Sequence, residues 1–212
     1  MRRTELFCHP EDEGSVVKDD LFFQKQSMKK IILASQSPRR KMLLEWAEIP
    51  FVIKVKETDE TYPPDTRIED VPVIIARNKA LAIDRSGNET VLAADTIVVL
   101  ENEIIGKPSN ASDAKRILKK LSGKTHRVIT GVVIMNGEKE ISFSDITEVS
   151  FHPLTEEQIS YYIEKYKPFD KAGAYAIQEW IGVTGIEKIN GDFYNVMGLP
   201  VSRVVKTLQQ LG

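Results

Sequence analysis

The sequence predicts an α/β protein with a mixed, twisted sheet flanked by helices. Apolar segments with the alternation of strands and amphipathic segments with the period of helices follow one another along the chain, as they do in α/β domains. A strong hairpin signal, Asn136-Gly137, lies between two strand-like segments, and hairpins join antiparallel strands. The sheet should therefore combine parallel and antiparallel pairs.

The compact domain should begin at residue 28. Residues 1–27 contain six acids and four bases, one short apolar cluster and no sustained period. We expect them to form an N-terminal extension without stable structure, and we expect residues 28–212 to form a single domain. Met28 is then a candidate for the functional start of the protein.

The first predicted elements are two strands and two helices. Ile31–Ala34 should be a short buried strand, and Ser37 should cap a helix that has Pro38 at its first position. Phe51–Val55 is predicted to return as a strand. Glu69–Ile83 has apolar residues at helical spacing and should form the second helix.

The middle of the chain should form a hairpin followed by a helix. Val91–Leu100 and Glu103–Ile105 are predicted strands, turned at Asn102. Ser112 should cap the helix that follows. Its apolar face has the spacing of an amphipathic helix and consists of Ala114, Ile117, Leu118 and Leu121.

The C-terminal part should complete the sheet and close with a helix. Thr125–Met135 and Glu140–Phe151 are the predicted strands on either side of the hairpin signal. A capping box starts a helix over residues 155–163. A further strand is expected near Val183–Ile189, and Leu199–Leu208 should form the last, amphipathic helix.

Composition and charge exclude several classes of protein. The formal net charge is −2 and the pI is near 6.0, so the general basic excess of a protein that binds nucleic acid polymers or anionic membranes is missing. The single cysteine, Cys8, excludes an internal disulfide and a cysteine-based zinc site. The longest apolar run contains a carboxylate and is half the roughly 20 residues that a membrane helix needs. With no signal peptide evident, we expect a cytoplasmic protein without a membrane partner.

A basic helix start is the first unusual feature. Arg39 and Arg40 would lie in the first turn of a helix, where the unpaired backbone N–H groups already favour anions and disfavour bases. With the hydroxyls of Ser35 and Ser37, these groups could bind a phosphate. The arginines could equally pair with nearby acids or remain solvated.

Asp95 is the second unusual feature, because it lies inside the apolar strand Val91–Leu100. A buried carboxylate costs several kcal/mol unless it is paired, hydrogen-bonded or bound to metal. It could be satisfied structurally, by backbone donors or an ion pair. As a functional group, Asp95 suits either a Mg²⁺ ligand or a general base that acts on water.

The remaining candidates are ordinary when taken one at a time. Asp59 and Glu60 follow a strand and could contribute to a metal site, Lys79 lies on a helix, Lys107 lies in a turn, and the amide of Gln178 could contact a base. The sequence contains neither a phosphate-binding loop of the GxxxxGKS/T type nor a GxGxxG motif. Any phosphate site must therefore be assembled from dispersed residues.

Six ordered motifs together resemble the Maf family of nucleoside triphosphate pyrophosphatases over about residues 29 to 210. They are 33–40 (LASQSPRR), 94–96 (ADT), 106–108 (GKP), 121–126 (LSGKTH), 170–175 (DKAGAY) and 198–200 (GLP). The resemblance implies a fold shared with inosine triphosphate pyrophosphatases, a nucleoside triphosphate substrate cleaved between its α and β phosphates, a divalent metal (Mg²⁺, with Mn²⁺ as an option), a cytoplasmic location and, often, a homodimer.

The resemblance also implies roles for individual residues. Asp95 matches the family's proton acceptor and a metal ligand, while Asp59 or Glu60, Lys79 and Lys107 match its phosphate and metal cluster. The residues that match positions associated with base choice in the dTTP/UTP branch are Arg39, Thr96 and Gln178. That branch usually reads Tyr-Gly-Ile-Gln-Gly, whereas this chain has Ala176 and Glu179 in place of the two glycines. If either position needs φ > 0, the loop must shift and base preference would change.

Two other functions stay open at this point. The first is a pyrophosphatase for purine or modified nucleotides that uses the same catalytic cluster. The second is a nucleotide-binding regulator, for instance of cell division, with little turnover. Retention of Asp95 and both lysines argues against the second, because binding alone does not require a base directed at water.

Overall fold

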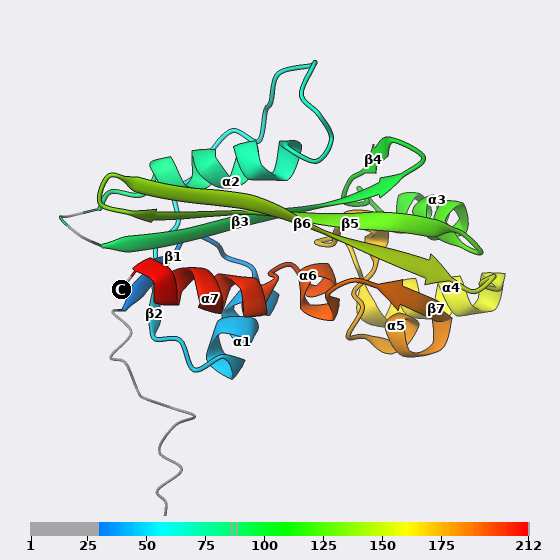
Figure 1. Ribbon diagram of the computed structural model, residues 1–212. Helices are drawn as coiled ribbons and strands as arrows, with labels where there is room; N and C mark the ends of the chain where they lie inside the picture. The colour runs from blue at the N-terminus through cyan, green and yellow to red at the C-terminus, as the bar shows by residue number, and fades with distance from the viewer. Residues whose placement is uncertain (1–29, 86, 88, 212) are drawn as a thin grey trace, which may run out of the picture.

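The computed structural model describes residues 30–85, 87 and 89–211 of the 212-residue chain. Its centre is a seven-stranded sheet in the order β2-β1-β3-β5-β6-β7, with β4 paired to β3 (Figure 1). β1 runs parallel to β2 and β3, whereas the remaining neighbours are antiparallel, so the predicted mixed sheet is confirmed. The strands are β1 (Ile31–Leu33), β2 (Phe51–Ile53), β3 (Thr90–Leu100), β4 (Glu103–Ile105), β5 (Thr125–Asn136), β6 (Lys139–Phe151) and β7 (Ile186–Asn190).

Helices cover both faces of the long strands. α2 lies on one face, and α1, α6 and α7 lie on the other (Figure 1). None of the helices within the described residues has the length and apolar character needed to cross a membrane. The helices are α1 (Pro38–Trp46), α2 (Val71–Leu81), α3 (Ala111–Leu121), α4 (Glu156–Tyr166), α5 (Trp180–Gly185), α6 (Phe193–Met197) and α7 (Val201–Leu211), with a short 3₁₀ turn, η1, at Ala172–Ala174.

The alternation of strand β3 divides the core into two parts. Its odd-numbered apolar residues pack with α2, since Val91 and Ala93 share a cluster with Ala76 and Ala80. Its even-numbered residues belong to the larger core on the opposite face, with α1, α3, α4 and α7. Because successive side chains of a strand point to opposite faces, Asp95 faces α2 and its neighbour Thr96 faces α1.

One edge of β3 is open in its middle. On one side β5 pairs with β3 from Thr90 to Val99 without interruption. On the other side β1 pairs only at Val91 and Leu92, and β4 only from Val98 to Leu100. No strand among the described residues pairs with positions 93–97 on that edge. Side chains from both faces of β3, including those of Asp95 and Thr96, therefore meet at the same gap in the sheet.

One local prediction was wrong, one was wrong in part, and one short helix was not predicted. Asn110, not Ser112, caps α3, because its side-chain oxygen accepts a hydrogen bond from the N–H of Asp113 at 3.0 Å. The segment around Val183 is helical, and only Ile186–Asn190 forms a strand. Val183 is 80% exposed, so its apolar character does not reflect a buried strand. The short helix α6 was not predicted. The predicted N-terminal extension lies outside the described residues.

Candidate active site

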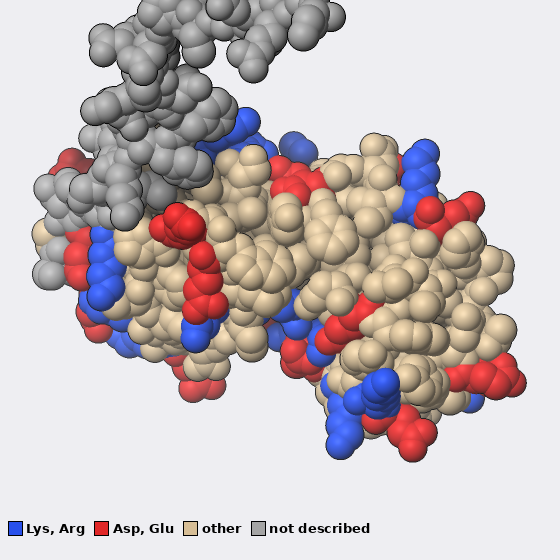
Figure 2. Space-filling model, turned by 90° about the horizontal axis from the view of Figure 1, so that it is seen from below, with Lys and Arg blue, Asp and Glu red and all other residues tan. Residues whose placement is uncertain are grey.

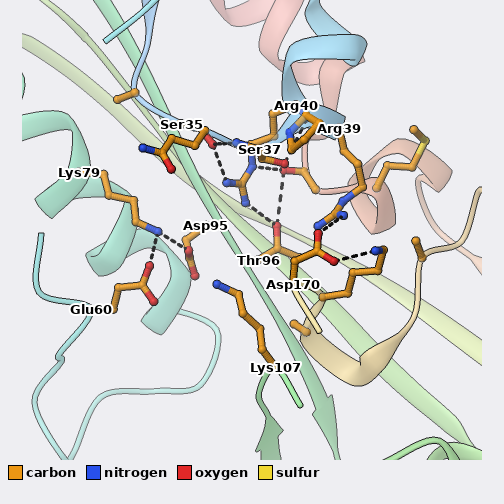
Figure 3. A pocket seen from close by; sticks show the side chains of 18 of the residues that line it. Ser35, Ser37, Arg39, Arg40, Glu60, Lys79, Asp95, Thr96, Lys107 and Asp170 are labelled. Carbon is orange, nitrogen blue, oxygen red and sulfur yellow. Dashed lines mark hydrogen bonds and ion pairs between the residues drawn. The ribbon is translucent and has the colours of Figure 1, made fainter. Parts of the chain in front are cut away.

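A pocket of about 670 Å³ opens at the gap in the sheet and is lined by α1, α2, β3 and the segment after α4. This volume is typical of small-molecule sites. Ten of the eleven predicted site residues line it, namely Ser35, Ser37, Arg39, Arg40, Glu60, Lys79, Asp95, Thr96, Lys107 and Gln178. The fold thus brings together residues that are far apart in the sequence, as Figure 3 shows for most of them.

Lys79 connects two carboxylates at one end of the pocket. Its Nζ lies 2.7 Å from Asp95 Oδ1 and 2.7 Å from Glu60 Oε1 (Figure 3). The Asp95 and Lys79 side chains are only 15% and 19% exposed, so their attraction is weakly screened by solvent. The hydrogen bond from Lys79 lowers the pKa of Glu60 below its ordinary value and outweighs partial burial, which acts in the opposite direction. Glu60 is therefore held as a carboxylate.

The two carboxylates fit a divalent metal. Both accept from a single ammonium group, so their oxygens lie no farther apart than the sum of two hydrogen-bond lengths. Mg²⁺ takes one or two carboxylates and completes its shell with water and substrate phosphates, so Glu60 and Asp95 suffice. The described residues contain no group of three or more His, Cys, Asp or Glu side chains arranged for a metal. Asp59 is turned elsewhere, because its Oδ1 accepts from the N–H of Thr61 at 3.1 Å and it does not line the pocket.

Lys107 reaches the same end of the pocket from the turn after β4. Figure 3 shows its ammonium group directed toward Asp95 and Glu60. It is also among the cations that lower the pKa of Glu60, after Lys79. Lys107 forms no ion pair with any other described residue, which leaves its charge available to an anion in the pocket.

The two arginines at the start of α1 have different environments. The predicted cap is confirmed, because Ser37 Oγ accepts from the N–H of Arg40 and Pro38 occupies the first turn. Arg40 is buried, and its guanidinium donates to Gly198 O at 2.7 Å, to Ser35 Oγ at 3.1 Å and to Thr96 Oγ1 at 3.0 Å. Burial lowers the pKa of Arg40, although Asp95 opposes that effect. Arg40 thus holds the walls of the pocket together.

Arg39 points instead into the open part of the pocket, where its Nη1 donates to Asp170 Oδ2 at 3.2 Å. Asp170 also accepts from Lys171 Nζ at 2.7 Å. Asp170 and Lys171 were not predicted as site residues, although both belong to the motif at 170–175. The contact joins positions 131 residues apart, which no local pattern reveals.

Thr96 is part of a buried polar chain on the other face of β3. Its hydroxyl lies 2.9 Å from that of Thr130, which donates to Asn195 O at 3.0 Å. Asn195 in turn donates to Val128 O at 3.1 Å. This chain fixes the Thr96 hydroxyl against Arg40 beneath the pocket floor.

A family model described as Maf-like protein matches residues 30–211. The chain belongs to the Maf family. Curated relatives of this Maf-like chain bear the name dTTP/UTP pyrophosphatase. One from Cytophaga hutchinsonii is 54% identical over 182 residues, which are 85% of this chain and 84% of the relative. One from Phocaeicola vulgatus is 50% identical over 185 residues, 86% and 96% of the two chains.

Among solved structures, the Maf-like chain resembles a HAM1 protein from Coxiella burnetii. The TM-score is 0.48 and the sequence identity 14%, over 85% of this chain and 98% of that chain. The family assignment rests on the match to the family model and on the sequence relatives.

The Maf-like chain accommodates Ala176 and Glu179 without backbone strain. Neither is among the described residues with positive φ, and Glu179 has φ of −95°. The left-handed conformation occurs slightly earlier, at Gly173 and Ala174. The two replacements therefore require no shift of the loop that carries Gln178.

Proposed function

We propose that this Maf-family protein is a nucleoside triphosphate pyrophosphatase that favours dTTP and UTP. It cleaves the substrate between the α and β phosphates and releases a nucleoside monophosphate and pyrophosphate. The names of its curated relatives support this substrate class. The observation that carries the proposal is the position of Lys79 between Glu60 and Asp95, with Lys107 lining the same pocket, at the open edge of β3.

The cations of the pocket bind the triphosphate. Lys79 and Lys107 approach from one end, and Arg39 approaches from the start of α1. The first turn of α1 adds backbone N–H groups, which favour an anion. The face seen in Figure 2 has no large patch of positive charge, because its Lys and Arg residues are scattered among Asp, Glu and uncharged residues.

Asp95 is the proposed proton acceptor. Its Oδ1 accepts a hydrogen bond from Lys79, which orients the carboxylate toward the pocket, where it can receive a proton from the attacking water. Glu60 and Asp95 would hold a divalent metal, Mg²⁺ or Mn²⁺. That ion supplies charge neutralisation for the phosphates and the leaving pyrophosphate.

Gln178 is the proposed contact to the nucleobase. Its amide is exposed and lines the pocket, so it is available as donor and acceptor together. Arg39 is also open to the pocket. Thr96, in contrast, is committed to Arg40 and Thr130, and we assign it to shaping the floor beneath the base. We further propose a cytoplasmic enzyme that can form a homodimer.

Product analysis tests the proposed function. The purified protein is incubated at fixed Mg²⁺ with a panel of canonical and modified triphosphates, and the products are separated by chromatography. We expect dTMP and UMP with stoichiometric pyrophosphate and the highest kcat/KM for dTTP and UTP. Higher kcat/KM for a purine or modified triphosphate would replace the substrate assignment. Tight binding without product would favour a regulator.

A further inference from the structure

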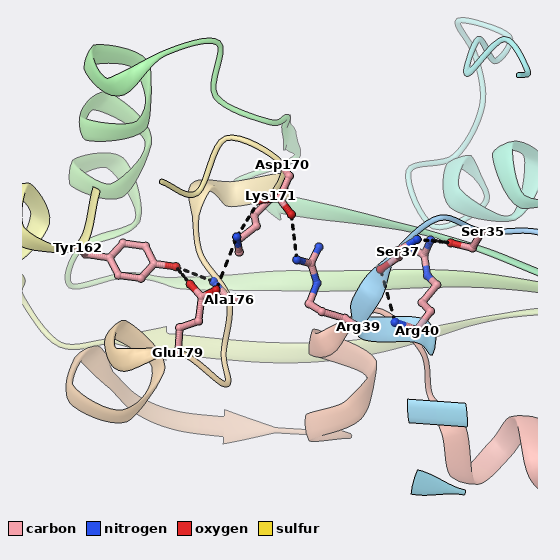
Figure 4. A network of polar contacts seen from close by, with 9 residues as sticks. All are labelled: Ser35, Ser37, Arg39, Arg40, Tyr162, Asp170, Lys171, Ala176 and Glu179. Atoms are coloured by element: carbon pink, nitrogen blue, oxygen red, sulfur yellow. Dashed lines mark hydrogen bonds and ion pairs between the residues drawn. The ribbon is translucent and has the colours of Figure 1, made fainter. Parts of the chain in front are cut away.

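Gln178 lies near the tip of a turn whose two ends contact one buried hydroxyl. The N–H of Glu179 donates to Ala176 O at 3.1 Å, which closes the turn over residues 176–179. The N–H of Ala176 donates to the hydroxyl of Tyr162 at 3.2 Å, and the same hydroxyl donates to the carboxylate of Glu179 (Figure 4). The Tyr162 hydroxyl therefore contacts both ends of the turn.

The surroundings make this support rigid. Tyr162 is fully buried in α4, and its ring stacks on Tyr166 with centroids 5.0 Å apart. Helix α5 also packs closely against the turn, because a Cβ added at Gly182 would lie 1.8 Å from Ile177 O. The turn thus has little freedom to move away from the pocket.

Glu179 extends the same support toward the pocket. Its second carboxylate oxygen lies 3.6 Å from Lys171 Nζ, and Lys171 pairs with Asp170, which pairs with Arg39. Figure 4 shows this chain running from Tyr162 on α4 to Arg39 on α1. Lys171 and Gln178 line the pocket, whereas Glu179 and Tyr162 do not. Glu179 thus acts through its neighbours.

We propose that Glu179 is a positioning residue that, anchored by Tyr162, fixes Gln178 and Lys171 and thereby sets how strongly the pocket distinguishes one nucleobase from another. The inference rests on the proposed function in taking a nucleoside triphosphate as the occupant. An amide presents a donor on one side and an acceptor on the other. Uracil presents an acceptor at position 4 and a donor at position 3, whereas cytosine presents the reverse, so an amide held in one orientation pairs with only one of the two bases.

Kinetic comparison of UTP and CTP tests the proposal. Tyr162→Phe and Glu179→Ala should each lower the ratio of kcat/KM for UTP to kcat/KM for CTP by about tenfold, which corresponds to about 1.4 kcal/mol. The loss should appear in KM, with kcat for UTP within about threefold of wild type. Because both residues belong to one contact, the double variant should resemble the single variants.

Matched variants separate positioning from general destabilisation. Tyr166→Phe, which keeps the ring that stacks on Tyr162, and Glu164→Ala make the same chemical changes at positions of α4 outside the turn contact, and they should keep the wild-type ratio. Glu179→Gln retains an oxygen that accepts from Tyr162 and should retain most of the discrimination. A Gln variant as poor as the Ala variant, or single variants with an unchanged ratio, would overturn the proposal.

A binding measurement keeps this proposal apart from the proposed function. Calorimetric titration of the wild-type protein with the α,β-imido analogues of UTP and CTP should show preference for the uridine analogue, and Glu179→Ala should lose it. Preference without pyrophosphate release from any triphosphate would remove the proposed function and leave this inference standing. Pyrophosphate release without a preference between the two analogues would overturn this inference and leave the proposed function standing. Binding of neither analogue would overturn both.

Discussion

Gly131 lies directly opposite Asp95 in the β3–β5 pair, and its lack of a side chain is what allows α2 to approach the sheet at this point. A Cβ on Gly131 would lie 2.3 Å from the backbone of Pro72 and Val73. The close approach of α2 brings Lys79 of the same helix to Asp95. A glycine without any contact to substrate therefore determines the geometry of the site.

Gly131→Ala should consequently displace α2. We expect a loss of about 1 to 3 kcal/mol in the free energy of unfolding, as for other overpacked positions, and a lower kcat/KM because Lys79 moves away from Asp95. Urea unfolding and steady-state kinetics measure the two effects. Gly106→Ala is the stability control, since an added Cβ there meets nothing within 4 Å. Equal stability of the two variants would contradict the packing argument.

Lys79→Met should lower kcat/KM by about a hundredfold, the size expected when one charged donor is removed from a catalytic site. The variant also removes the largest cause of the lowered pKa of Glu60. The pKa of Glu60 should rise, and the acid limb of the pH–rate profile should move to higher pH. Lys206→Met, on the exposed side of α7, is the matched control. An acid limb at the wild-type position would show that Lys79 does not lower the pKa of Glu60.

The two adjacent arginines should respond differently to substitution. Arg40→Lys removes a buried fork that three acceptors share, so we expect a loss of about 2 to 4 kcal/mol in stability. Arg39→Lys should change stability by less than about 1 kcal/mol, because its ion pair with Asp170 is exposed, but it should raise KM. Thermal unfolding and KM measurements on both variants check this. A large loss of stability for Arg39→Lys together with a raised KM but unchanged stability for Arg40→Lys would contradict the roles assigned to the two arginines.

His126 should make stability depend on pH in mildly acidic solution. It is 1% exposed, its Nε2 lies 2.7 Å from the Tyr175 hydroxyl, and burial lowers its pKa from 6.5 to about 4. The unfolded chain therefore binds a proton that the folded protein excludes. The contribution of neutral His126 to the free energy of unfolding is fully present above pH 6.5 and is lost as pH falls toward 4, by about 3 kcal/mol in total.

Urea unfolding between pH 4.5 and 7.5 measures this effect. The difference in unfolding free energy between wild type and His126→Gln should grow with pH, because glutamine does not titrate and other groups cancel. Parallel curves for the two proteins would show that folding does not change the pKa of His126 and would contradict this prediction.

The sheet was largely predictable because its signals are local. The apolar run of β3, the Asn136-Gly137 turn and the capping box of α4 each depend on neighbouring residues, and the structure has all three. The strand expected over Val183–Ile189 begins only at Ile186, because Trp180–Gly185 forms a short helix whose Gly182 packs against the carbonyl group of Ile177.

The candidate site was predictable as a set of residues, although its internal contacts were not. Asp95 stood out because a carboxylate in an apolar strand requires a partner, and the structure supplies Lys79. Arg40 is held in the interior by its hydrogen bond to Gly198, and Arg39 is held in the pocket by its contact with Asp170. Both partners are distant in sequence, so the different environments of the two arginines could not be predicted. The support of Gln178 by Tyr162 has the same origin.

Pyrophosphate release by Asp95→Asn tests the central claim most directly. The substitution preserves the size of the side chain and removes the proton acceptor, so kcat with dTTP or UTP should fall by about a thousandfold. The α,β-imido analogues should still bind, more weakly because one proposed metal ligand is lost, and the unfolding curve should show that the variant is folded. Pyrophosphate release near the wild-type rate from the folded variant would contradict the assignment of Asp95 and, with it, the proposed mechanism.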